Sequence, residues 1–522
     1  MKKIHVQNLV VLVLAAAALL AGCKKKGGDG QQAQPLTPPA TEKPKSGTMI
    51  PGGEIVLGFA TEMNNFDPFT SMTADARSVN FNIFDGLVNV APDGSFSPAI
   101  AESYSSEEGR AFVFTLRQNV KFHDGSPLTH DDVLYSVQKA IDSKMAGYDK
   151  IRDFRFVPDG MGGVTDIFVI TLKSADAGFI AYLTTPIVKK DAKDLALHPV
   201  GTGPYMLADY VEQDHIRLVK NPSYWGKGGY LDTVTLKFVA SQADMVLNFQ
   251  AGSIDGFSAN ADTVTQLPEK DLNLYRRNSN SVQLLALNNA VAPFGDVRVR
   301  QALSYLVDAD EIIEAVNYGY GVKVGSGLIP ALSKYYDVSL AGAYKKDVAK
   351  ARALLAEAGY ADGFSFTITV PSVYTVHVRT AEVILNQLAQ AGIKASIKQV
   401  DWPTWLQNVY TGRQYEATII SLDGPLAYPT SYLSRYQSGA HNNFVNFASP
   451  AYDEVYAKAI ASTDDDERVA YFKEAQKILS DEAASVFIED ISNLTVYSKK
   501  FAGVRDYPLY ATDFSAIYRV SE

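Results

Sequence analysis

Residues 401–436 combine aromatic side chains, a carboxylate and a tight turn, which are groups that a protein uses to hold a polar organic molecule. Two of the three tryptophans in the chain, Trp402 and Trp405, lie here. They stand three residues apart on a short expected helix, so both indoles can face the same way. Such a pair can stack on a sugar ring or on an apolar side chain of a ligand. This stretch is therefore the richest candidate binding site in the chain.

The strand that we expect over 416–422 runs directly into Asp423 and Gly424. A carboxylate at a strand end can pair with the ammonium group of a ligand, and the affinity that it adds depends on geometry. The alternative interpretation is that Asp423 only shapes the turn together with Gly424. We add the neighbouring Ser421 and Tyr428 to the candidate binding residues.

Motifs that would indicate an enzyme are absent from the sequence. There is no Gly-x-Ser-x-Gly elbow, no His-Glu-x-x-His motif and no cysteine suited to catalysis. His123 and His130 fall on a turn and at a helix start without a third ligand nearby, so we expect no zinc site. The acidic run Asp464–Asp466 lacks the alternating ligands and the glycine of a calcium loop. A chain with 58 acidic residues contains many candidates for a catalytic pair of carboxylates, so a surface hydrolase is an alternative.

The composition is that of a soluble globular protein with an acidic surface. Its 522 residues suffice for two or three domains, and 47% of them are hydrophobic while 20% are charged. The net charge is −10, which argues against a nucleic-acid partner. The 29 tyrosines suit a wet binding surface, because tyrosine joins contact area to one polar tip. We expect a monomer that needs no cofactor.

The N-terminal part of the chain predicts export from the cytoplasm and attachment to a membrane. Residues 1–22 have a basic start and an apolar run that is too short to span a bilayer, as in a secretory signal. The following Leu-Ala-Gly-Cys resembles the lipobox of bacterial lipoproteins, which implies that Cys23 is acylated. An ordinary signal with a chance cysteine is the alternative. Residues 23–53 are rich in Gly, Pro and Gln, so we expect a disordered linker on the extracytoplasmic face of the cell envelope.

The rest of the chain alternates strands and helices. A strand is expected over 54–60, where the folded part begins. Later the pattern predicts a strand over 364–370, a helix over 379–391 and a strand over 395–400. This order indicates an α/β lobe with a partly parallel sheet, which places ligands beyond the ends of its strands.

Several phrases of the sequence resemble, in the same order, the extracellular solute-binding proteins of family 5, which are the dipeptide- and oligopeptide-binding proteins of ABC importers. The phrases are FHDGSPLTHDDVLYS at 122–136, VGTGPY at 200–205, NPSYWG at 221–226 and FGDVRVRQALSYLVDADEII at 294–313. The resemblance implies an α/β fold of the type II periplasmic-binding-protein kind. In that fold two lobes with an extra subdomain are hinged by two crossing strands, here near residues 285 and 490.

The resemblance also implies an order of domains. The boundaries that we expect are 1–22 for a lipoprotein signal peptide, 23–53 for the lipidated cysteine and linker, 54–90, 196–285 and 491–522 for three parts of lobe I, 91–195 for the extra subdomain (lobe II), and 286–490 for lobe III.

Further binding residues are implied by the same resemblance. In family 5 the loop after the first strand borders the ligand cleft, which implicates Thr70 and Ser71. The crossing strands bring Asn288 and Glu489 into consideration. Glu489 either reaches the cleft or only flanks it.

The loop after 416–422 departs from the family pattern. Peptide binders of family 5 carry an aspartate here that takes the α-ammonium group of the peptide. Residues 429–433 match the end of that phrase, but Pro425 occupies the position of the aspartate. Asp423 lies two residues earlier, and a shifted loop can still present it to an ammonium group.

The resemblance implies a receptor and not an enzyme. We expect the protein to capture di- or oligopeptides in a cleft between lobes and to deliver them to an ABC permease. The alternatives are the same role for an oligosaccharide, a nickel or other metal chelate or another nitrogenous solute, a surface hydrolase, and a sensor or adhesin that has lost transport.

Overall fold

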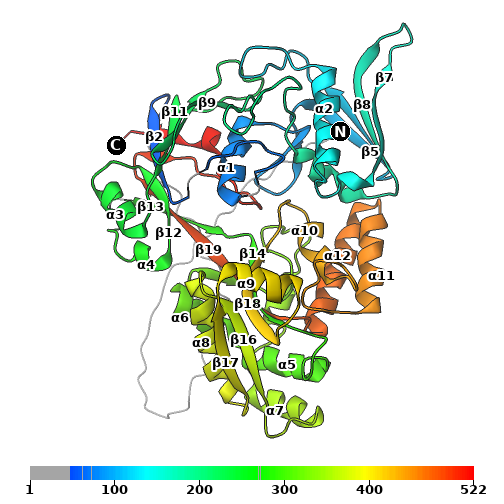
Figure 1. Cartoon of the computed structure of the whole chain (residues 1–522), viewed down its shortest axis with the longest axis vertical. Coiled ribbons are helices and arrows are strands. Elements are labelled where there is room, and N and C mark those ends of the chain that lie inside the picture. The colour runs from blue at the N-terminus through cyan, green and yellow to red at the C-terminus, as the bar shows by residue number, and fades with distance from the viewer. Residues whose placement is uncertain (1–47, 62, 72, 269, 271, 522) are drawn as a thin grey trace, which may run out of the picture. The chain divides into compact units, whose positions relative to one another are not determined.

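The computed structural model describes residues 48–521 apart from 62, 72, 269 and 271. The predicted signal peptide, Cys23 and most of the predicted linker lie outside the described residues. Twelve of the described strands pair into one large sheet, which joins distant parts of the chain (Figure 1). Along the sheet the strands are β17 (Lys394–Val400), β16 (Ser365–Pro371), β18 (Ala417–Asp423), β14 (Ser281–Leu287), β19 (Val486–Ser498), β12 (Gly256–Ala259), β2 (Glu54–Phe59), β11 (Thr233–Phe238), β10 (His215–Lys220) and β9 (Tyr205–Val211), with β13 (Leu272–Asn278) and β15 (Gly321–Lys323) also paired to β19.

The large sheet contains two groups of three parallel strands. In one group β2 pairs in parallel with β11 and with β12. In the other group β16 pairs in parallel with β17 and with β18. Because parallel strands run the same way, the carboxyl ends of each group meet at one edge. We call these the first edge, which follows Phe59, Phe238 and Ala259, and the second edge, which follows Pro371, Val400 and the end of β18 at Asp423.

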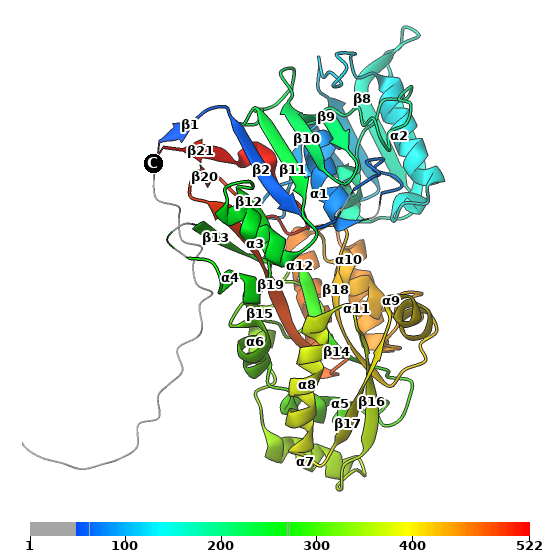
Figure 2. The same cartoon turned by 60° about the vertical axis from the view of Figure 1, so that its left-hand side comes forward.

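A ribbon of crossing strands connects the two groups (Figure 2). β19 pairs with β14 at its start and with β13 at its end. β13 and β14 follow one another along β19, and only Ser279 and Asn280 separate them. Asn280 has a φ of 58°, in the left-handed region, which turns the chain at this point. The two crossing strands expected near residues 285 and 490 are thus confirmed.

Three smaller sheets and a set of helices complete the fold. The smaller sheets are formed by β5 (Ala101–Glu107), β6 (Ala111–Leu116), β8 (Val164–Leu172) and β7 (Ile151–Pro158), by β3 (Val88–Val90) and β4 (Phe96–Pro98), and by β1 (Met49–Ile50), β21 (Tyr518–Val520) and β20 (Phe501–Ala502). The α-helices are α1 (Ala74–Ile83), α2 (His130–Asp142), α3 (Gln242–Gln250), α4 (Ala261–Val264), α5 (Val297–Leu306), α6 (Ala309–Asn317), α7 (Val348–Glu357), α8 (Thr375–Ala389), α9 (Trp402–Thr404), α10 (Thr430–Leu433), α11 (Pro450–Ala461) and α12 (Asp465–Asp481). Within the described range, none of the helices combines the length and the apolar run that crossing a bilayer requires.

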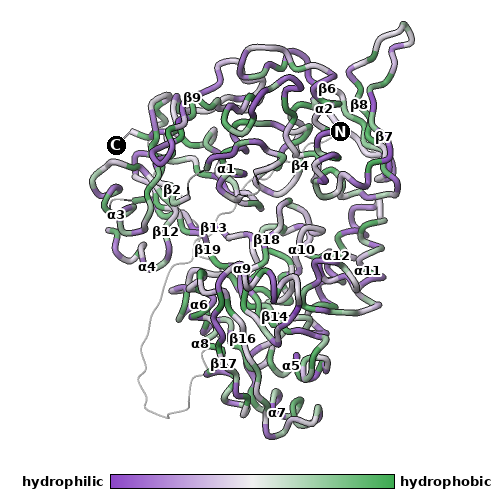
Figure 3. Tube along the Cα trace, viewed as in Figure 1, coloured by the Kyte–Doolittle hydropathy of each residue, from purple (hydrophilic) through white to green (hydrophobic). Residues whose placement is uncertain are grey.

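The centre of the sheet is buried on both faces. On β14, Leu284 packs into one hydrophobic cluster, and its neighbour Leu285 packs into another. Successive residues of a strand point to opposite faces, so both faces of β14 are covered. This explains why its sequence is an almost continuous apolar run, and Figure 3 shows the hydrophobic trace around β14 and β18.

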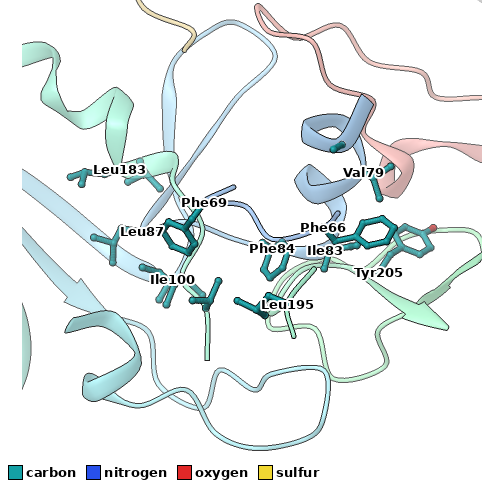
Figure 4. Packing of buried hydrophobic residues seen from close by; sticks show 14 of the residues in the cluster. Phe66, Phe69, Val79, Ile83, Phe84, Leu87, Ile100, Leu183, Leu195 and Tyr205 are labelled. Carbon is teal, nitrogen blue, oxygen red and sulfur yellow. The ribbon is translucent and has the colours of Figure 1, made fainter. Parts of the chain in front are cut away.

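The turn at 200–205 packs against the end of α1. Gly203 donates its N–H to the carbonyl of Ile83 at 2.9 Å. A Cβ at Gly203 would lie 2.6 Å from the carbonyl oxygen of Asn82, so only glycine fits. Tyr205 is fully buried in the same hydrophobic cluster as Phe66 (Figure 4). The turn therefore holds α1 on the sheet.

The buried carboxylate of Asp85 joins the two most distinctive phrases of the sequence. It accepts hydrogen bonds from Trp225 Nε1 at 2.9 Å and from Thr202 Oγ1 at 3.2 Å, while Asn89 Nδ2 donates at 2.8 Å. Burial raises the pKa of Asp85, and these donors oppose the shift. The phrases at 200–205 and 221–226 thus stabilise the fold around Asp85.

The expected elements around the second edge are found with small shifts of boundary. The strands expected over 364–370 and 395–400 are β16 and β17, each displaced by one residue at most. The helix expected over 379–391 is α8, which begins four residues earlier, at Thr375. The preceding Tyr374 makes no side-chain cap, so the sequence lacks the usual signal for a helix start.

Candidate functional site

A cavity of about 300 Å³ opens at the first edge of the large sheet. Its walls come from the ends of β2 and β12, from α1, from the paired strands β13 and β19, and from the C-terminal segment 506–514. Ligands of open α/β sheets bind beyond the carboxyl ends of parallel strands, and this volume is at the lower end for small-molecule sites. All wall residues fall in the ranges 54–90, 196–285 and 491–522, which the sequence assigns to lobe I.

The β13–β19 pair presents a polar face to this cavity. Arg277 lies opposite Asn493 in the antiparallel register, and both line the cavity together with Thr495. The preceding Arg276 points to the other face of the sheet, since side chains alternate along a strand. Its guanidinium lies 4.7 Å from the ring centre of Tyr320. Only one of the two adjacent arginines therefore faces the cavity.

The guanidinium of Arg277 is loosely held. Nη1 donates to the carbonyl of Ala511 at 3.4 Å, and Nη2 donates to Thr495 Oγ1 at 3.5 Å. Good N–H···O bonds are about 2.7–3.2 Å long. Nε has no hydrogen-bond partner within the described part of the chain, and it lies 3.7 Å from Asp506 Oδ1. Arg277 thus lines the cavity with a guanidinium whose hydrogen-bonding capacity is only partly used.

Two carboxylates share the cavity with Arg277. Asp75, in the first turn of α1, accepts a hydrogen bond from Tyr510 Oη at 3.2 Å. Asp506 stands beside Arg277 and is more than half exposed. Both acids lie where α1 and the C-terminal segment face each other. The cavity consequently carries charge of both signs, which suits a ligand that has polar groups of both signs.

The second edge brings together two aromatic rings and a carboxylate. Tyr374 and Trp402 follow the ends of β16 and β17, and Asp423 ends β18. The two rings meet edge to face with centres 5.5 Å apart. Tyr374 is exposed and Trp402 is half-buried, so the pair forms an accessible aromatic surface at the same edge of the sheet as the acid.

Asp423 keeps its carboxylate open, with 69% of the side chain exposed. Its Oδ2 lies 3.9 Å from Arg77 Nη2 on α1, which is a weak contact between exposed charges. The backbone carbonyl of Asp423 accepts a hydrogen bond from Arg435 Nη2 at 2.8 Å. A Cβ on the following Gly424 would lie 2.7 Å from Tyr432, so glycine is required by packing. The turn is shaped by Gly424, and the acid stays available.

The two edges meet at Asn280. This residue lines the cavity, and its carbonyl accepts a hydrogen bond from Tyr432 Oη at 3.0 Å. The next residue, Ser281, lies directly opposite Asp423 in the β14–β18 register. Arg277 stands four residues before Ser281, which is at most about 13 Å along a strand. The cavity and the acid of the second edge are therefore neighbours.

Trp405 and Tyr428 are core residues that support the second edge from behind. Trp405 begins a short π-helix, Trp405–Thr411, and is 2% exposed. Its Nε1 donates to Thr418 Oγ1 at 2.9 Å, and its ring stacks on Trp402 with centres 5.2 Å apart. Tyr428 is buried against Tyr335. Trp402 is thus the tryptophan of the pair that a ligand can reach.

Ser421 lies on the face of β18 that Asp423 shares, because two residues separate them. It is half-buried, and its Oγ has no hydrogen-bond partner among the residues that the structure describes. This position is compatible with the predicted role in binding.

Asn288 is not brought to either edge. It follows β14 at the end opposite to Asp423. Its side-chain amide donates to the carbonyls of Arg413 and Tyr415 at 3.1 and 2.9 Å, and Asn446 Nδ2 donates to its Oδ1 at 2.7 Å. Asn288 therefore ties loops together at the far end of the strand.

Thr70 and Ser71 lie in the connection between β2 and α1 but outside the cavity wall. Thr70 is exposed and accepts a hydrogen bond from Asn65 Nδ2 at 3.1 Å, whereas Ser71 is buried. The residues of this connection that do line the cavity are Ala60 and Thr61, immediately after β2.

Glu489 lies fully buried in the crossing ribbon, next to the buried Asp490. Asn317 Nδ2 donates to Glu489 Oε1 at 2.7 Å, and Ser279 Oγ donates to Asp490 Oδ1 at 2.8 Å. Burial raises the pKa of Glu489 to about 8 and that of Asp490 to about 7. Neither residue lines the cavity, so Glu489 flanks the site.

Several wall residues were missed from the sequence, above all Arg277, Asp75 and Thr61. A signal for Arg277 was present, because two adjacent arginines in a strand must face opposite sides. Thr61 could have been found from the rule that ligands lie just beyond the ends of parallel strands. Asp506 lies in an irregular segment, far along the chain from the strands whose cavity it lines. No pattern in the sequence indicates this position.

The described residues include no group of three or more His, Cys, Asp or Glu that is arranged to hold a metal ion. His123 is a packing residue, since Gly201 donates its N–H to His123 Nδ1 at 3.3 Å, and burial lowers the pKa of His123 to about 4. His130 pairs with Asp166 at 2.9 Å.

Known proteins resemble the chain over most of its length. The model of "Bacterial extracellular solute-binding proteins, family 5 Middle" matches residues 95–444. Heme-binding protein A of Haemophilus influenzae is 29% identical over 81% of this chain and 84% of its own length. The periplasmic oligopeptide-binding protein OppA of Escherichia coli is 26% identical over 86% of this chain and 89% of its own.

A solved structure shows the same architecture. The periplasmic binding protein DppA from Helicobacter pylori, in complex with the peptide STSA, has a TM-score of 0.72 and 25% identity over 90% of this chain and 99% of its own. The expected fold class is confirmed, namely the mixed α/β type II periplasmic-binding-protein fold with two crossing strands.

Proposed function

Because the chain belongs to family 5 of the bacterial extracellular solute-binding proteins, whose members bind solutes and are not enzymes, we propose that it is the lipid-anchored receptor of an ABC importer for peptides. It captures di- or oligopeptides between its lobes, outside the cytoplasm, and delivers them to a permease. The predicted lobe boundaries are part of this proposal.

The observation that carries the proposal is the juxtaposition of the two edges. The first edge offers a cavity with loosely held hydrogen-bond donors, and the second offers an open carboxylate beside an aromatic surface. A peptide has an ammonium group, a carboxylate and side chains, so each part finds a complementary group. A ligand that touches both lobes stabilises their closed arrangement over the open one.

Peptide chemistry is favoured by relatives as well. The names of two similar proteins specify peptides, an oligopeptide for OppA and the peptide STSA for DppA, whereas a third specifies heme. The accessible rings of Tyr374 and Trp402 suit a sugar too, which keeps an oligosaccharide as the second candidate. Nickel or other metal chelates form the third class to be tested.

The direct test is a thermal-shift screen of the folded protein. A ligand that binds only the native state raises Tm, by an amount that grows with its concentration above Kd. Di- to pentapeptides at millimolar concentration are expected to raise Tm, while oligosaccharides and nickel chelates leave it unchanged. The peptide assignment is wrong if peptides have no effect and another class raises Tm.

The membrane anchor is tested separately at Cys23. Wild-type protein expressed in a bacterium is expected to incorporate labelled fatty acid and to sediment with membranes, because acylation adds apolar surface that inserts into the bilayer. Cys23→Ser is expected to lose the label. Equal labelling of both forms would contradict the lipoprotein assignment.

A further inference from the structure

We infer that Asp262, Tyr318 and Arg379 form a clasp between the predicted lobes I and III, which stabilises the closed receptor without touching the ligand. Asp262 belongs to α4 in lobe I, whereas Tyr318 follows α6 and Arg379 lies in α8, both in lobe III. α4 and α6 lie side by side in both views of the fold (Figure 1 and Figure 2). This role rests on the lobe closure of the proposed function and adds a device that sets how often the lobes close.

The carboxylate of Asp262 accepts hydrogen bonds from two side chains of lobe III. Tyr318 Oη donates to Asp262 Oδ1 at 2.6 Å, and Arg379 Nη1 donates to Asp262 Oδ2 at 3.3 Å. Each carboxylate oxygen thus has its own donor from the other lobe. The Tyr318 hydroxyl and the Arg379 guanidinium lower the pKa of Asp262, so the carboxylate keeps its charge to a lower pH.

The backbone of Tyr318 supports a role beyond its own helix. Its φ is 54°, in the left-handed region, where a helix normally ends with glycine or asparagine. A bulky residue in this conformation costs free energy. Tyr318 is also 49% exposed, so packing within lobe III does not explain a tyrosine here. The hydroxyl contact to Asp262 is what a glycine at this position would lose.

The corner that carries Tyr318 is anchored to the crossing ribbon. Two residues later, the carbonyl of Tyr320 accepts a hydrogen bond from the N–H of Ser492 on β19 at 3.1 Å. The guanidinium of Arg276 on β13 lies 4.7 Å from the ring centre of Tyr320. We therefore expect a hinge movement in the ribbon to change the distance between Tyr318 and Asp262 on α4.

The clasp is separate from the ligand site. Among the described residues that line the first-edge cavity, none belongs to the clasp. The side chains of Asp262 and Arg379 are 44% and 52% exposed, so their attraction is modest and is screened by salt. The apparent affinity of a receptor scales with the population of its binding-competent state. A clasp that favours closure therefore strengthens the binding of every ligand by the same factor.

The first experiment measures closure without a ligand, by single-molecule energy transfer between dyes on the two lobes. Leu247→Cys on lobe I and Val338→Cys on lobe III give exposed attachment points, in a Cys23→Ser background that removes the natural cysteine. Asp262→Ala and Tyr318→Phe should each lower the ratio of closed to open molecules by about 3- to 10-fold. If both variants keep the wild-type ratio, the clasp does not exist.

Two further variants serve as controls. Asp310→Ala removes an ion pair with Lys323 that lies within lobe III, at 3.1 Å, and should close like wild type. An equal loss of closure in Asp310→Ala would show a general effect of surface charge and would contradict the clasp. Tyr318→Gly suits the left-handed backbone, so it should leave Tm unchanged or raise it while closing as poorly as Tyr318→Phe. Wild-type closure of Tyr318→Gly would likewise reject the role of the hydroxyl.

Ligand binding gives an independent readout. Asp262→Ala should weaken a dipeptide and a tripeptide by the same factor of about 3 to 10, mainly through faster dissociation. Raising the salt concentration from about 50 to about 500 mM should weaken the binding of wild type more than that of Asp262→Ala. A factor that differs between the two ligands would place Asp262 in the ligand site and contradict the clasp. If wild type binds no peptide, the peptide function fails, while the ligand-free measurement still decides on the clasp.

Discussion

The two edges of the large sheet are built on the same plan but differ in what they leave open. Each is the carboxyl end of three parallel strands. The first edge keeps a cavity, whose polar wall is carried by the regular strands β13 and β19. At the second edge Trp405 is stacked behind Trp402 in the core, while the pair of Tyr374 and Trp402 and the carboxylate of Asp423 stay accessible. The shared topology thus supports a pocket in one place and a surface in the other.

Residue type alone is therefore a poor guide to which side chains meet a ligand. The aromatic residues of the sequence predicted a binding site at the second edge, yet Trp405 and Tyr428 are buried in the core. At the first edge an arginine in a plain strand, Arg277, keeps unused donors. Burial and hydrogen-bond satisfaction separate the two groups of residues better than chemistry does.

The largest expected effect separates the two stacked tryptophans. Trp405→Ala should lower the free energy of unfolding by about 3–5 kcal/mol, because it empties a buried site and removes the bond to Thr418. Trp402→Ala should cost much less stability and should instead weaken ligand binding. Chemical denaturation and calorimetry of both variants measure this, and equal stability losses would show that both indoles belong to the core.

The next prediction concerns the open acid of the second edge. Asp423→Asn should weaken a peptide with a free amine by about 10-fold, since a charge-assisted bond becomes a neutral one. The N-acetylated form of the same peptide should bind both proteins alike. An equal loss for the two peptides would reject the anchor role and leave Asp423 as a turn residue only.

A smaller binding effect is expected from the first turn after β2. Thr61→Ala should weaken the ligand by about 3- to 10-fold through the loss of one hydrogen bond from the cavity wall. Thr70→Ala, its matched control nine residues later, should change affinity by less than twofold because Thr70 lies outside the wall. A larger loss of affinity for Thr70→Ala than for Thr61→Ala would contradict this and would indicate that the ligand binds against the loop that precedes α1.

The smallest effect concerns the ribbon that joins the two edges. Burial raises the pKa of Glu489 from 4.5 to about 8, so the folded protein retains a proton that the unfolded chain releases. Stability is therefore lost as pH rises from about 4.5 to about 8. Glu489→Gln removes this titration and should raise Tm by about 1–3 °C at pH 8.5, with no gain at pH 4. Scanning calorimetry at both values checks the sign, and a gain that is larger at pH 4 would contradict it.

Much of the fold was predictable because local patterns and the global topology agree. The crossing strands were implied by the family resemblance, and the apolar run of β14 fits that role because β14 is buried on both faces. The phrases at 200–205 and 221–226 could be recognised because glycine packing and the partners of Asp85 leave little freedom of sequence.

The site was only partly predictable, because it depends on contacts between distant segments. Asp423 and Trp402 were found from strand ends and residue type, and the structure places both at the second edge. Arg277 owes its role to the C-terminal segment, which supplies Ala511 and Asp506 from more than 200 residues away. No local sequence pattern predicts such a contact. None predicts either that the side-chain amide of Asn288 is taken up by hydrogen bonds to neighbouring loops.

The most direct test of the account is native mass spectrometry of the purified protein, mixed with equal amounts of a dipeptide, a tripeptide, a hexapeptide, an oligosaccharide and a nickel chelate. One bound molecule per chain is expected, a di- or tripeptide, which is released on denaturation with its mass unchanged. A bound sugar or chelate, or a peptide that is recovered in fragments, would contradict it.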